Sequence, residues 1–460
     1  MSRLKRREFL NSTLAGFSAL SLGVIGTTNA QTPAKKTPDL KTAAPNKTAA
    51  DKLPTTGVSD PKLALFDELM QAFMKEHQPP GAALAVVKSG RLVYARGFGY
   101  ADREQKVAVD PQSLFRIASL SKSLTSAAIL RLVENGKLKL DAKVFDLLKI
   151  APHLPSGANV DPRLSDVTVL HCLQHSAGWD RGKGFDPMGA VASEEIAQTL
   201  KIKLPLHEEP IIRYTFGRKL DFDPGTQYVY SNFGYCVLGR MIEIVSGQKY
   251  DDYVKTEILA PLGIRQMRLG KNLLADRAQG EVKYYDSRDR TGRAISGPKI
   301  GQPAPFPYGV ESLETMDANG GWIASAVDLA KFITAFDDPT KCPILNERSV
   351  RTMFAPPAGA LGHSPDGKTL NVYYACGWQV RPVDEQRGKW TRWHTGLLSG
   401  TSTLMVARAD DIAWVVLFNS DADSAGKQFA GMIDPLLHGP ANKLKDWPDG
   451  NLFDEVLRPE

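Results

Sequence analysis

The chain has 460 residues, of which 42% are hydrophobic and 23% are charged, proportions typical of a globular protein and not of a disordered one. The first 60 residues hold nine Lys and Arg against four Asp and Glu, which leaves 48 against 47 in the remaining 400. A nucleic-acid-binding protein needs a basic stripe on its folded body. This body has no surplus of positive charge to form one, so the composition argues against that class.

Residues 1–30 have the features of an export signal. Arg6-Arg7 is followed by a weakly apolar run, Leu14 to Ile25, and by small residues at Thr28-Asn29-Ala30 where a signal peptidase would cut. The segment resembles a twin-arginine signal and predicts a periplasmic or secreted protein. The apolar run is shorter than the roughly 20 residues that span a bilayer, and no other stretch approaches that length, so we expect no stable membrane insertion.

Residues 31–60 are rich in Thr, Ala, Lys and Pro and hold few bulky apolar residues. Such a segment buries too little apolar surface to offset its chain entropy, so it is predicted to be a flexible linker. The folded domain is then expected over 61–440, with a C-terminal tail over 441–460.

The domain is predicted to begin with a helix and a hairpin. Apolar residues recur at helical spacing from Leu63 to Phe73. Two apolar runs, Ala82–Val87 and Leu92–Gly97, then flank the turn Lys88-Ser89-Gly90, which is typical of a β-hairpin.

The middle of the chain is predicted to be mostly helical, and strands return near the end. Helical periodicity dominates from Ser119 to about Leu148, and a helical lobe is expected over about 120–315. The late strands are expected at Gly377–Val380, Thr391–His394, Ser402–Arg408 and Ile412–Asn419, before a closing helix that contains Phe429, Met432, Ile433, Leu436 and Leu437.

Strands at both ends of the chain indicate one antiparallel sheet assembled from both ends. The predicted fold is α/β (α+β), with the sheet sandwiched between N- and C-terminal helices and a mostly helical lobe inserted. A site at the interface between sheet and lobe follows from this arrangement.

The sequence holds four cysteines, Cys172, Cys236, Cys342 and Cys376. Their spacing is not that of a zinc site, and either disulfides or buried free thiols fit their pattern.

Ser119-Leu120-Ser121-Lys122 opens the helical run. Serine and lysine three residues apart share a helix face, and a partly desolvated lysine can take the serine proton because burial lowers its pKa. The tetrapeptide pattern alone is weak, since Ser-x-x-Lys occurs at five other places. The sequence also holds one Tyr-x-Asn, Tyr230-Ser231-Asn232, and one His-x-Gly, His394-Thr395-Gly396.

In this order and spacing the three elements resemble the serine hydrolases of the class C β-lactamase and penicillin-binding protein family, which includes D,D-peptidases, D-amino-acid peptidases and esterases. The resemblance covers about residues 62–435. It extends to Phe115-Arg116-Ile117-Ala118 before the serine, to His175-Ser176-Ala177-Gly178, and to Gly320-Gly321 with the residues that follow them.

The resemblance implies a role for each residue that matches the motifs. Ser119 would be the acylated nucleophile and Lys122 its proton partner. Tyr230 would protonate the leaving group and activate the deacylating water, with a lowered pKa if it acts as a phenolate.

The same resemblance implies the substrate-binding groups. Asn232 would bind the substrate carbonyl or hold Lys122. The edge strand that carries His394, Thr395 and Gly396 would align the substrate, and the N–H groups of Ser119 and Leu397 would form the oxyanion hole. No metal or cofactor is implied.

The sequence departs from the pattern of the wider group at one position, where the charge of the side chain differs. Many members of the wider group have Lys-Thr-Gly where this chain has His394-Thr395-Gly396. A histidine is mostly neutral above pH 6.5, so it lacks the permanent cation that faces the carboxylate of a penicillin. Ester, amide or D-amino-acid peptide substrates are therefore expected over efficient β-lactam hydrolysis.

Other interpretations of these residues are less specific. Tyr230 and His394 are also compatible with plain core packing. His171 and His175 have i, i+4 spacing but no third metal ligand nearby. Residues 362–369 match the Walker A pattern, but the flanking residues indicate a hairpin turn at Asp366-Gly367.

The leading hypothesis is an exported serine hydrolase that acts on a small molecule or short peptide through an acyl-enzyme on Ser119. The alternative is a non-hydrolytic sensor that binds penicillin or cell-wall fragments in the same pocket. Tyr230 favours turnover, because a binding module needs no deacylation chemistry. The pattern does not specify an oligomeric state.

Overall fold

The computed structural model describes residues 53–183 and 186–456. The predicted export signal and residues 31–52 of the predicted linker lie outside this part of the chain. The last residues of that linker belong to the fold, because β1 (Thr55–Thr56) pairs with β3 at Phe98 and Gly97. The ordered domain therefore begins before residue 61.

One antiparallel sheet of nine strands forms the centre of the domain. Its main path runs β1-β3-β2-β14-β13-β12-β11-β10, and β4 pairs with β3. The pairing of β2 with β14, from Ala82 opposite Phe418 to Lys88 opposite Ile412, joins the N-terminal hairpin to the C-terminal strands. The strands beyond β1 are β2 (Gly81–Lys88), β3 (Arg91–Asp102), β4 (Val107–Ala108), β10 (Tyr373–Tyr374), β11 (Gln379–Asp384), β12 (Lys389–Leu398), β13 (Thr401–Ala407) and β14 (Ile412–Phe418).

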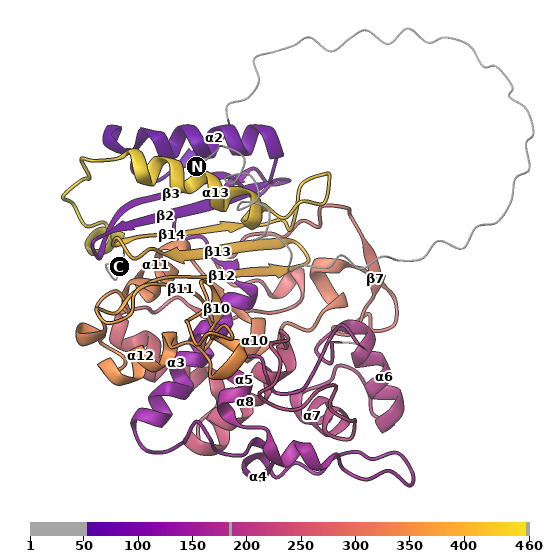
Figure 1. Ribbon diagram of the computed structural model, residues 1–460. Coiled ribbons are helices and arrows are strands. Elements are labelled where there is room, and N and C mark those ends of the chain that lie inside the picture. Colours follow the sequence, from indigo (N-terminus) through magenta and orange to yellow (C-terminus); the bar gives the residue numbers. More distant parts are fainter. Residues whose placement is uncertain (1–52, 184–185, 457–460) are drawn as a thin grey trace, which may run out of the picture. The chain divides into compact units, whose positions relative to one another are not determined.

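Helices cover both faces of this sheet, as the sequence predicted (Figure 1). On one face α2 (Ala64–His77) packs against α13 (Phe429–Lys443), and on the other α11 (Ala326–Thr334) lies under β2 and β14. Residues of β14 alternate between the two cores: Trp414 and Val416 join the α2–α13 side, while Val415 joins the larger core of the lobe side. This period of two is the pattern of a strand buried on both faces.

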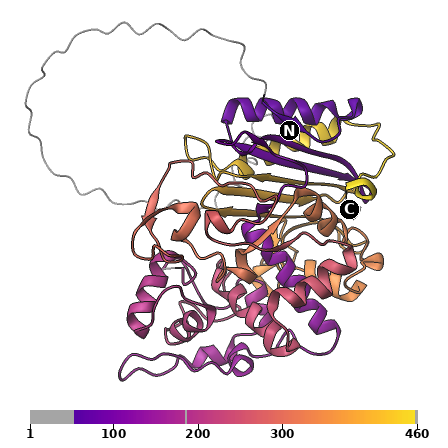
Figure 2. The same ribbon diagram turned by 180° about the vertical axis from the view of Figure 1, so that it is seen from behind.

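The helical lobe lies on the α11 side of the sheet (Figure 2). The long helical run predicted from Ser119 breaks after α3 (Ser121–Glu134), where Gly136 has a positive φ of 68°, and α4 (Val144–Leu148) follows. The other helices on this side are α5 (Val169–Leu173), α6 (Ala190–Leu200), α7 (Glu208–Phe216), α8 (Asn232–Ser246), α9 (Tyr250–Val254), α10 (Asp317–Gly320) and α12 (Glu347–Phe354).

Short strands complete the lobe side. They are β5 (Phe115–Arg116), β9 (Trp322–Ala324) and β6 (Arg268–Leu269) in one small sheet, and β7 (Thr291–Arg293) with β8 (Pro303–Pro305) in another. Through β5 and β9 the chain returns from the lobe beside the segment that leads to α3.

Residues 441–456 do not form a separate tail. Helix α13 continues to Lys443, and the chain then returns to β3, where the Leu452 N–H donates to the Leu92 carbonyl at 2.8 Å. The Leu92 N–H donates to Asn451 Oδ1, and a short helix, α14 (Phe453–Val456), ends the described part. The expected boundary at 440/441 is therefore too early.

The segment that matches Walker A forms a turn, as its context predicted. Ser364 N–H donates to the Lys368 carbonyl at 2.9 Å, and Gly367 has a φ of 78°. The next regular element along the chain is the strand β10, not a phosphate-binding helix.

None of the helices within residues 53–183 and 186–456 combines the length and apolar character needed to cross a bilayer.

Strands β12 and β13 both pass directly against the chain that leads into α3. Thr403 Oγ1 donates to the Ile117 carbonyl at 3.0 Å, and Thr401 Oγ1 donates to the Arg116 carbonyl at the same distance. A Cβ atom on Gly396 would collide with Thr403 Oγ1 and with the Ile117 carbonyl oxygen. Glycine is therefore required at 396 by close approach of two backbone segments.

We predict that Gly396→Ala destabilises the domain by about 1–3 kcal/mol, because the added methyl group forces apart two segments that are each tied into the core. Thermal or urea unfolding measures this change. Gly431→Ala is the matched control: nothing lies within 4 Å of the position that its Cβ would take on α13, so stability should be unchanged or slightly raised. Equal stability of the two variants would contradict the close-approach argument.

Candidate active site

Ser119 lies at a strained junction between strand and helix. Ala118, the residue before it, has a φ of 49°, a left-handed conformation that alanine rarely adopts. The 3₁₀ turn Ala118–Leu120 then runs directly into α3. Backbone strain of this kind persists only where the surroundings impose it, here the bonds from β13 described above.

Lys122 is completely buried one turn after Ser119 and brings three segments together. Its Nζ lies 3.1 Å from Ser119 Oγ, 2.8 Å from Asn232 Oδ1 and 2.7 Å from the Asn319 carbonyl oxygen. These partners come from the 3₁₀ turn before α3, the start of α8 and α10. The structure thus places Ser119, Lys122 and Asn232 within direct contact, as the sequence predicted.

The surroundings favour the neutral amine of Lys122. Burial lowers its pKa well below the usual value; Asp186 opposes this shift and Arg181 adds to it. A neutral amine has two hydrogens and one lone pair. The Asn232 and Asn319 oxygens can only accept, so they take the two hydrogens, and the lone pair is left for the Ser119 hydroxyl. Lys122 is therefore arranged as a base toward Ser119.

Asn232 is held in one orientation by a carboxylate that sequence reasoning missed. While its Oδ1 accepts from Lys122, its Nδ2 donates to Asp186 Oδ2 at 2.6 Å. Ser231 caps α8 by accepting from the Gly234 N–H, which fixes Asn232 in the first turn of that helix. Of the two roles expected for Asn232, this geometry supports holding Lys122.

Tyr230 lies over the same lysine, just before α8. The centroid of its ring is 4.9 Å from Lys122 Nζ and 4.9 Å from Arg181 Cζ. Burial raises the pKa of Tyr230, although a hydrogen bond with Ser119 opposes the shift. The structure therefore favours a neutral phenol as the resting form. The lowered pKa considered for a phenolate is not supported, because desolvation outweighs the nearby charges.

His394 is buried in β12, with an exposed fraction of 4%. Its Nδ1 lies 2.7 Å from the Thr395 carbonyl, which can only accept, and its Nε2 lies 2.9 Å from the Tyr374 hydroxyl. Burial, followed by the influence of Lys122, lowers the pKa of His394 to about 3. The ring is therefore neutral and Nε2 accepts from Tyr374, so neither nitrogen is free for a substrate carboxylate.

Strand β12 is not the edge strand that was expected, because β11 pairs with its first half; only the second half of β12 offers a backbone edge. Pairing of β12 with β11 ends at Trp393, whereas pairing with β13 continues from Arg392 to Leu398. The segment Thr395–Leu397 therefore has no strand on its β11 side within the described chain, and the Leu397 side chain is 43% exposed. A substrate that adds to this edge would lie beside Ser119, since Gly396 abuts Ile117 and Ala118.

The two histidines considered as metal ligands, His171 and His175, lie in different parts of the fold. His171 accepts through Nδ1 from the Thr168 N–H in a capping box at the start of α5. His175 follows that helix in a left-handed conformation and packs among tyrosine rings. Within the described residues, no group of three or more His, Cys, Asp or Glu side chains is placed to hold a metal ion.

Arg181, Asp186, Asn319 and Tyr374 join the site without a sequence signal. The first two lie in the Gly-rich loop after His175-Ser176-Ala177-Gly178, and the Arg181 Nη1 to Asp186 Oδ2 distance is 3.9 Å. Asn319 takes part through its carbonyl oxygen, which any residue could supply. Only the motif just before the loop marked this region as close to the site.

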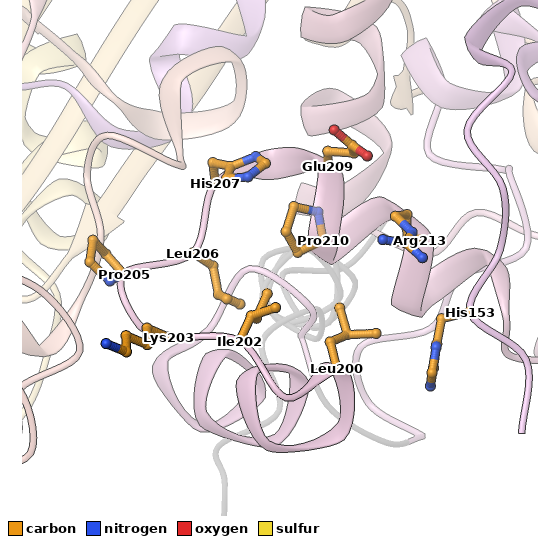
Figure 3. Close-up of a pocket in the computed structure, with 10 residues that line it drawn as sticks. All are labelled: His153, Leu200, Ile202, Lys203, Pro205, Leu206, His207, Glu209, Pro210 and Arg213. Carbon is orange, nitrogen blue, oxygen red and sulfur yellow. The ribbon is translucent and has the colours of Figure 1, made fainter.

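The pocket in Figure 3 is a separate feature of the helical lobe. It has a volume of about 340 Å³ and lies around the start of α7, between His153, Leu200, His207 and Arg213. None of the residues that line it is a predicted site residue. The contacts of Ser119, and not this hollow, therefore define the candidate active site.

Comparisons with known proteins identify the family of the chain. The family model described as Beta-lactamase matches residues 66–433. A probable fimbrial assembly protein FimD from Dichelobacter nodosus is 30% identical over 297 residues, which cover 63% of this chain and 62% of that protein, so the match spans less than two thirds of that relative. Penicillin-binding protein 4* from Bacillus subtilis is 27% identical over 366 residues, 78% of this chain and 72% of that protein.

Solved structures share the fold. EstCE1, a hydrolase with promiscuous acyltransferase activity, superposes with a TM-score of 0.61 at 22% identity, over 84% of this chain and 99% of that one. The D-amino acid amidase from Ochrobactrum anthropi SV3 has a TM-score of 0.60 at 21% identity, over 82% of this chain and 99% of that one. The chain belongs to the beta-lactamase family.

Asp186 raises the pKa of Lys122 and Arg181 lowers it, so removal of either charge should shift the pH dependence of activity in opposite directions. Lys122 accepts a proton only when neutral, so kcat/KM should rise with pH through its pKa. Asp186→Asn keeps an oxygen for Asn232 but removes the charge that raises this pKa, so the acid limb should move to lower pH. Arg181→Gln should move it to higher pH. The pH profiles of kcat/KM for both variants test this, and shifts in the same direction would refute it.

Proposed function

We propose that this member of the beta-lactamase family is an exported serine hydrolase that cleaves ester and amide bonds, D-amino-acid amides and peptides among them, through an acyl-enzyme on Ser119. One observation carries the proposal: the Nζ of the buried Lys122 lies 3.1 Å from Ser119 Oγ, 2.8 Å from Asn232 Oδ1 and 2.7 Å from the Asn319 carbonyl oxygen, so a neutral amine directs its lone pair at the serine. A hydroxyl with a base at hydrogen-bond distance is the arrangement of an activated nucleophile.

In the proposed acylation, the Ser119 proton passes to Lys122 Nζ while Oγ attacks the substrate carbonyl. The N–H groups of Ser119 and Leu397 would stabilise the oxyanion, an interaction worth roughly 3 kcal/mol per donor in comparable enzymes. The neutral phenol of Tyr230 then protonates the leaving group. Its proton is replaced from the Lys122 ammonium, which lies 4.9 Å from the centre of the tyrosine ring.

Deacylation would use the same groups in reverse. A water molecule takes the place of the leaving group, transfers its proton toward Tyr230 and Lys122, and attacks the acyl carbonyl. Ser119 leaves as the alkoxide and recovers the proton from Lys122, which restores the neutral amine. Each turnover therefore begins and ends with uncharged Lys122 and Tyr230.

The charges near Ser119 favour a substrate whose bound group is uncharged. His394 is neutral, with both ring nitrogens bonded, and the Arg181 guanidinium is near Asp186. Exposed apolar surface lies close by, since Tyr228 is 45% exposed and packs on Tyr374. The names of the similar proteins, a penicillin-binding protein, a hydrolase with acyltransferase activity and a D-amino acid amidase, are consistent with acyl transfer.

Export is proposed from the sequence alone. Arg6-Arg7, the short apolar run and Thr28-Asn29-Ala30 resemble a twin-arginine signal, and a periplasmic or secreted location follows from them. In that location the enzyme would meet small-molecule esters, amides or short peptides that contain D-residues.

We predict that a fluorophosphonate probe labels the wild type and leaves Ser119→Ala unlabelled, because Oγ is the only atom that the proposal makes nucleophilic. Ser119→Ala should also lose more than about 1,000-fold in kcat on any ester that the wild type cleaves. Gel fluorescence and intact mass measure the label. Labelling of the alanine variant would refute the assignment, and a single burst of product without turnover would support a sensor instead.

We further predict a higher kcat/KM for a p-nitrophenyl ester than for a chromogenic cephalosporin, with D-alanyl p-nitroanilide as the amide substrate to compare. The neutral His394 offers no cation to the cephalosporin carboxylate. Initial rates over a range of substrate concentrations give the three values. A cephalosporin value well above that of the ester would show that another group recognises the carboxylate.

A further inference from the structure

The loop His175–Gly178 follows α5 and has no role in the chemistry described so far. Its first residue, His175, has a φ of 56°, a left-handed conformation that is uncommon for a residue with a side chain. The side chain is almost completely buried, with an exposed fraction of 1%. A strained, buried histidine next to a catalytic centre calls for a physical reason.

His175 accepts hydrogen bonds from the residues on both sides of Tyr230 in the sequence. The His175 carbonyl accepts from the Val229 N–H at 2.8 Å, and its Nδ1 accepts from the Ser231 N–H at 3.1 Å. One residue further, the Ser176 carbonyl accepts from the Gly225 N–H at 2.7 Å. The loop that carries Tyr230 is therefore bonded to His175 immediately before and immediately after the tyrosine.

The imidazole ring also contacts the phenol ring directly. Ring centroids of His175 and Tyr230 lie 4.2 Å apart at an interplanar angle of 41°, and those of His175 and Tyr374 lie 4.4 Å apart at 49°. Tyr374 is itself bonded to His394 in β12. His175 thus packs against both Tyr374 of β10 and Tyr230, and it restricts the ring as well as the backbone of Tyr230.

We propose that His175 is the positioning residue for Tyr230: its Nδ1, its carbonyl and its ring hold the phenol where it can transfer a proton to the leaving group on Ser119. The inference rests on the proposed function. It assigns His175 no contact with the substrate, because the side chain is buried behind the tyrosine.

The acceptor role requires a neutral imidazole. Burial is the main reason that the pKa of His175 lies well below its usual value, and Lys122, His394 and Arg181 lower it further. The other titratable groups that face the ring are the phenols of Tyr228, Tyr230, Tyr235 and Tyr374. Nδ1 therefore keeps its lone pair and the hydrogen lies on Nε2, which has no hydrogen-bond partner among the described residues.

Two substitutions separate the contributions of the ring and of the acceptor. His175→Asn retains an acceptor oxygen close to the position of Nδ1 and tolerates the left-handed conformation, but it loses the ring. His175→Phe retains the ring and removes the unpaired Nε2–H, but it leaves the Ser231 N–H without an acceptor. Circular dichroism and thermal unfolding establish that both variants are folded.

The readout is the dependence of kcat/KM on the leaving group. p-Nitrophenolate departs without a proton, whereas ethoxide requires one, so a displaced Tyr230 penalises ethyl butyrate far more than p-nitrophenyl butyrate. For His175→Phe we expect a loss of about 100-fold on the ethyl ester and less than about tenfold on the p-nitrophenyl ester. For His175→Asn we expect losses of less than about tenfold on both esters.

A double-mutant cycle shows whether the effect acts through Tyr230. In a Tyr230→Phe background, His175→Phe should cause no further change in the ratio of the two kcat/KM values. Equal losses on both esters, or an additive effect in that background, would overturn the positioning role while the proposed function stands. If the wild type and Ser119→Ala hydrolyse both esters equally, the proposed function fails, and the role of His175 fails with it.

Discussion

The burial of one amine determines most of the architecture around the site. Lys122 lies in the first turn of α3, and the ten residues from Ser121 to Leu130 are all buried. The polar members of this run are bonded, for example Ser123 and Ser126 to the Gly377 and Cys376 carbonyls. A charged lysine in such surroundings would be costly, so the fold stabilises the neutral form that can accept the serine proton.

Three parts of the chain must meet for this amine to be satisfied. Helix α10 presents its carbonyl groups to α3, where Thr125 Oγ1 donates to Ala318 and Lys122 donates to Asn319. Helix α10 is fixed in turn by the ion pair between Arg240 of α8 and Asp317, 2.5 Å apart. Residues far apart in sequence are therefore linked by one buried polar network, and loss of a single partner would leave a buried polar group unsatisfied.

Most of the fold followed from the sequence, because strands with a period of two and helices with a period of about 3.6 are local patterns. The candidate site residues Ser119, Lys122, Tyr230 and Asn232 came from the resemblance of three ordered motifs to a family. The structure brings these residues together, and their roles stay predictions. The role of Asp186 did not follow, because its contact with Asn232 joins a loop residue to the start of α8, 46 residues away in sequence, and has no local pattern. The protonation of Tyr230 was likewise unpredictable, since it depends on the balance between desolvation of the phenol and nearby charges.

The same balance bears on the range of acyl compounds proposed as substrates. Lys122, Tyr230 and His394 are all favoured in their neutral forms, and the ion pair that contacts Tyr230 and Asn232 is Arg181 with Asp186. Long-range charge attraction then contributes little to recognition. The free backbone edge of β12 can bond any extended acyl group, because main-chain hydrogen bonds are independent of side-chain identity. Selectivity must therefore come from the shape and apolar character of the surroundings, which vary most readily in the loops of the helical lobe.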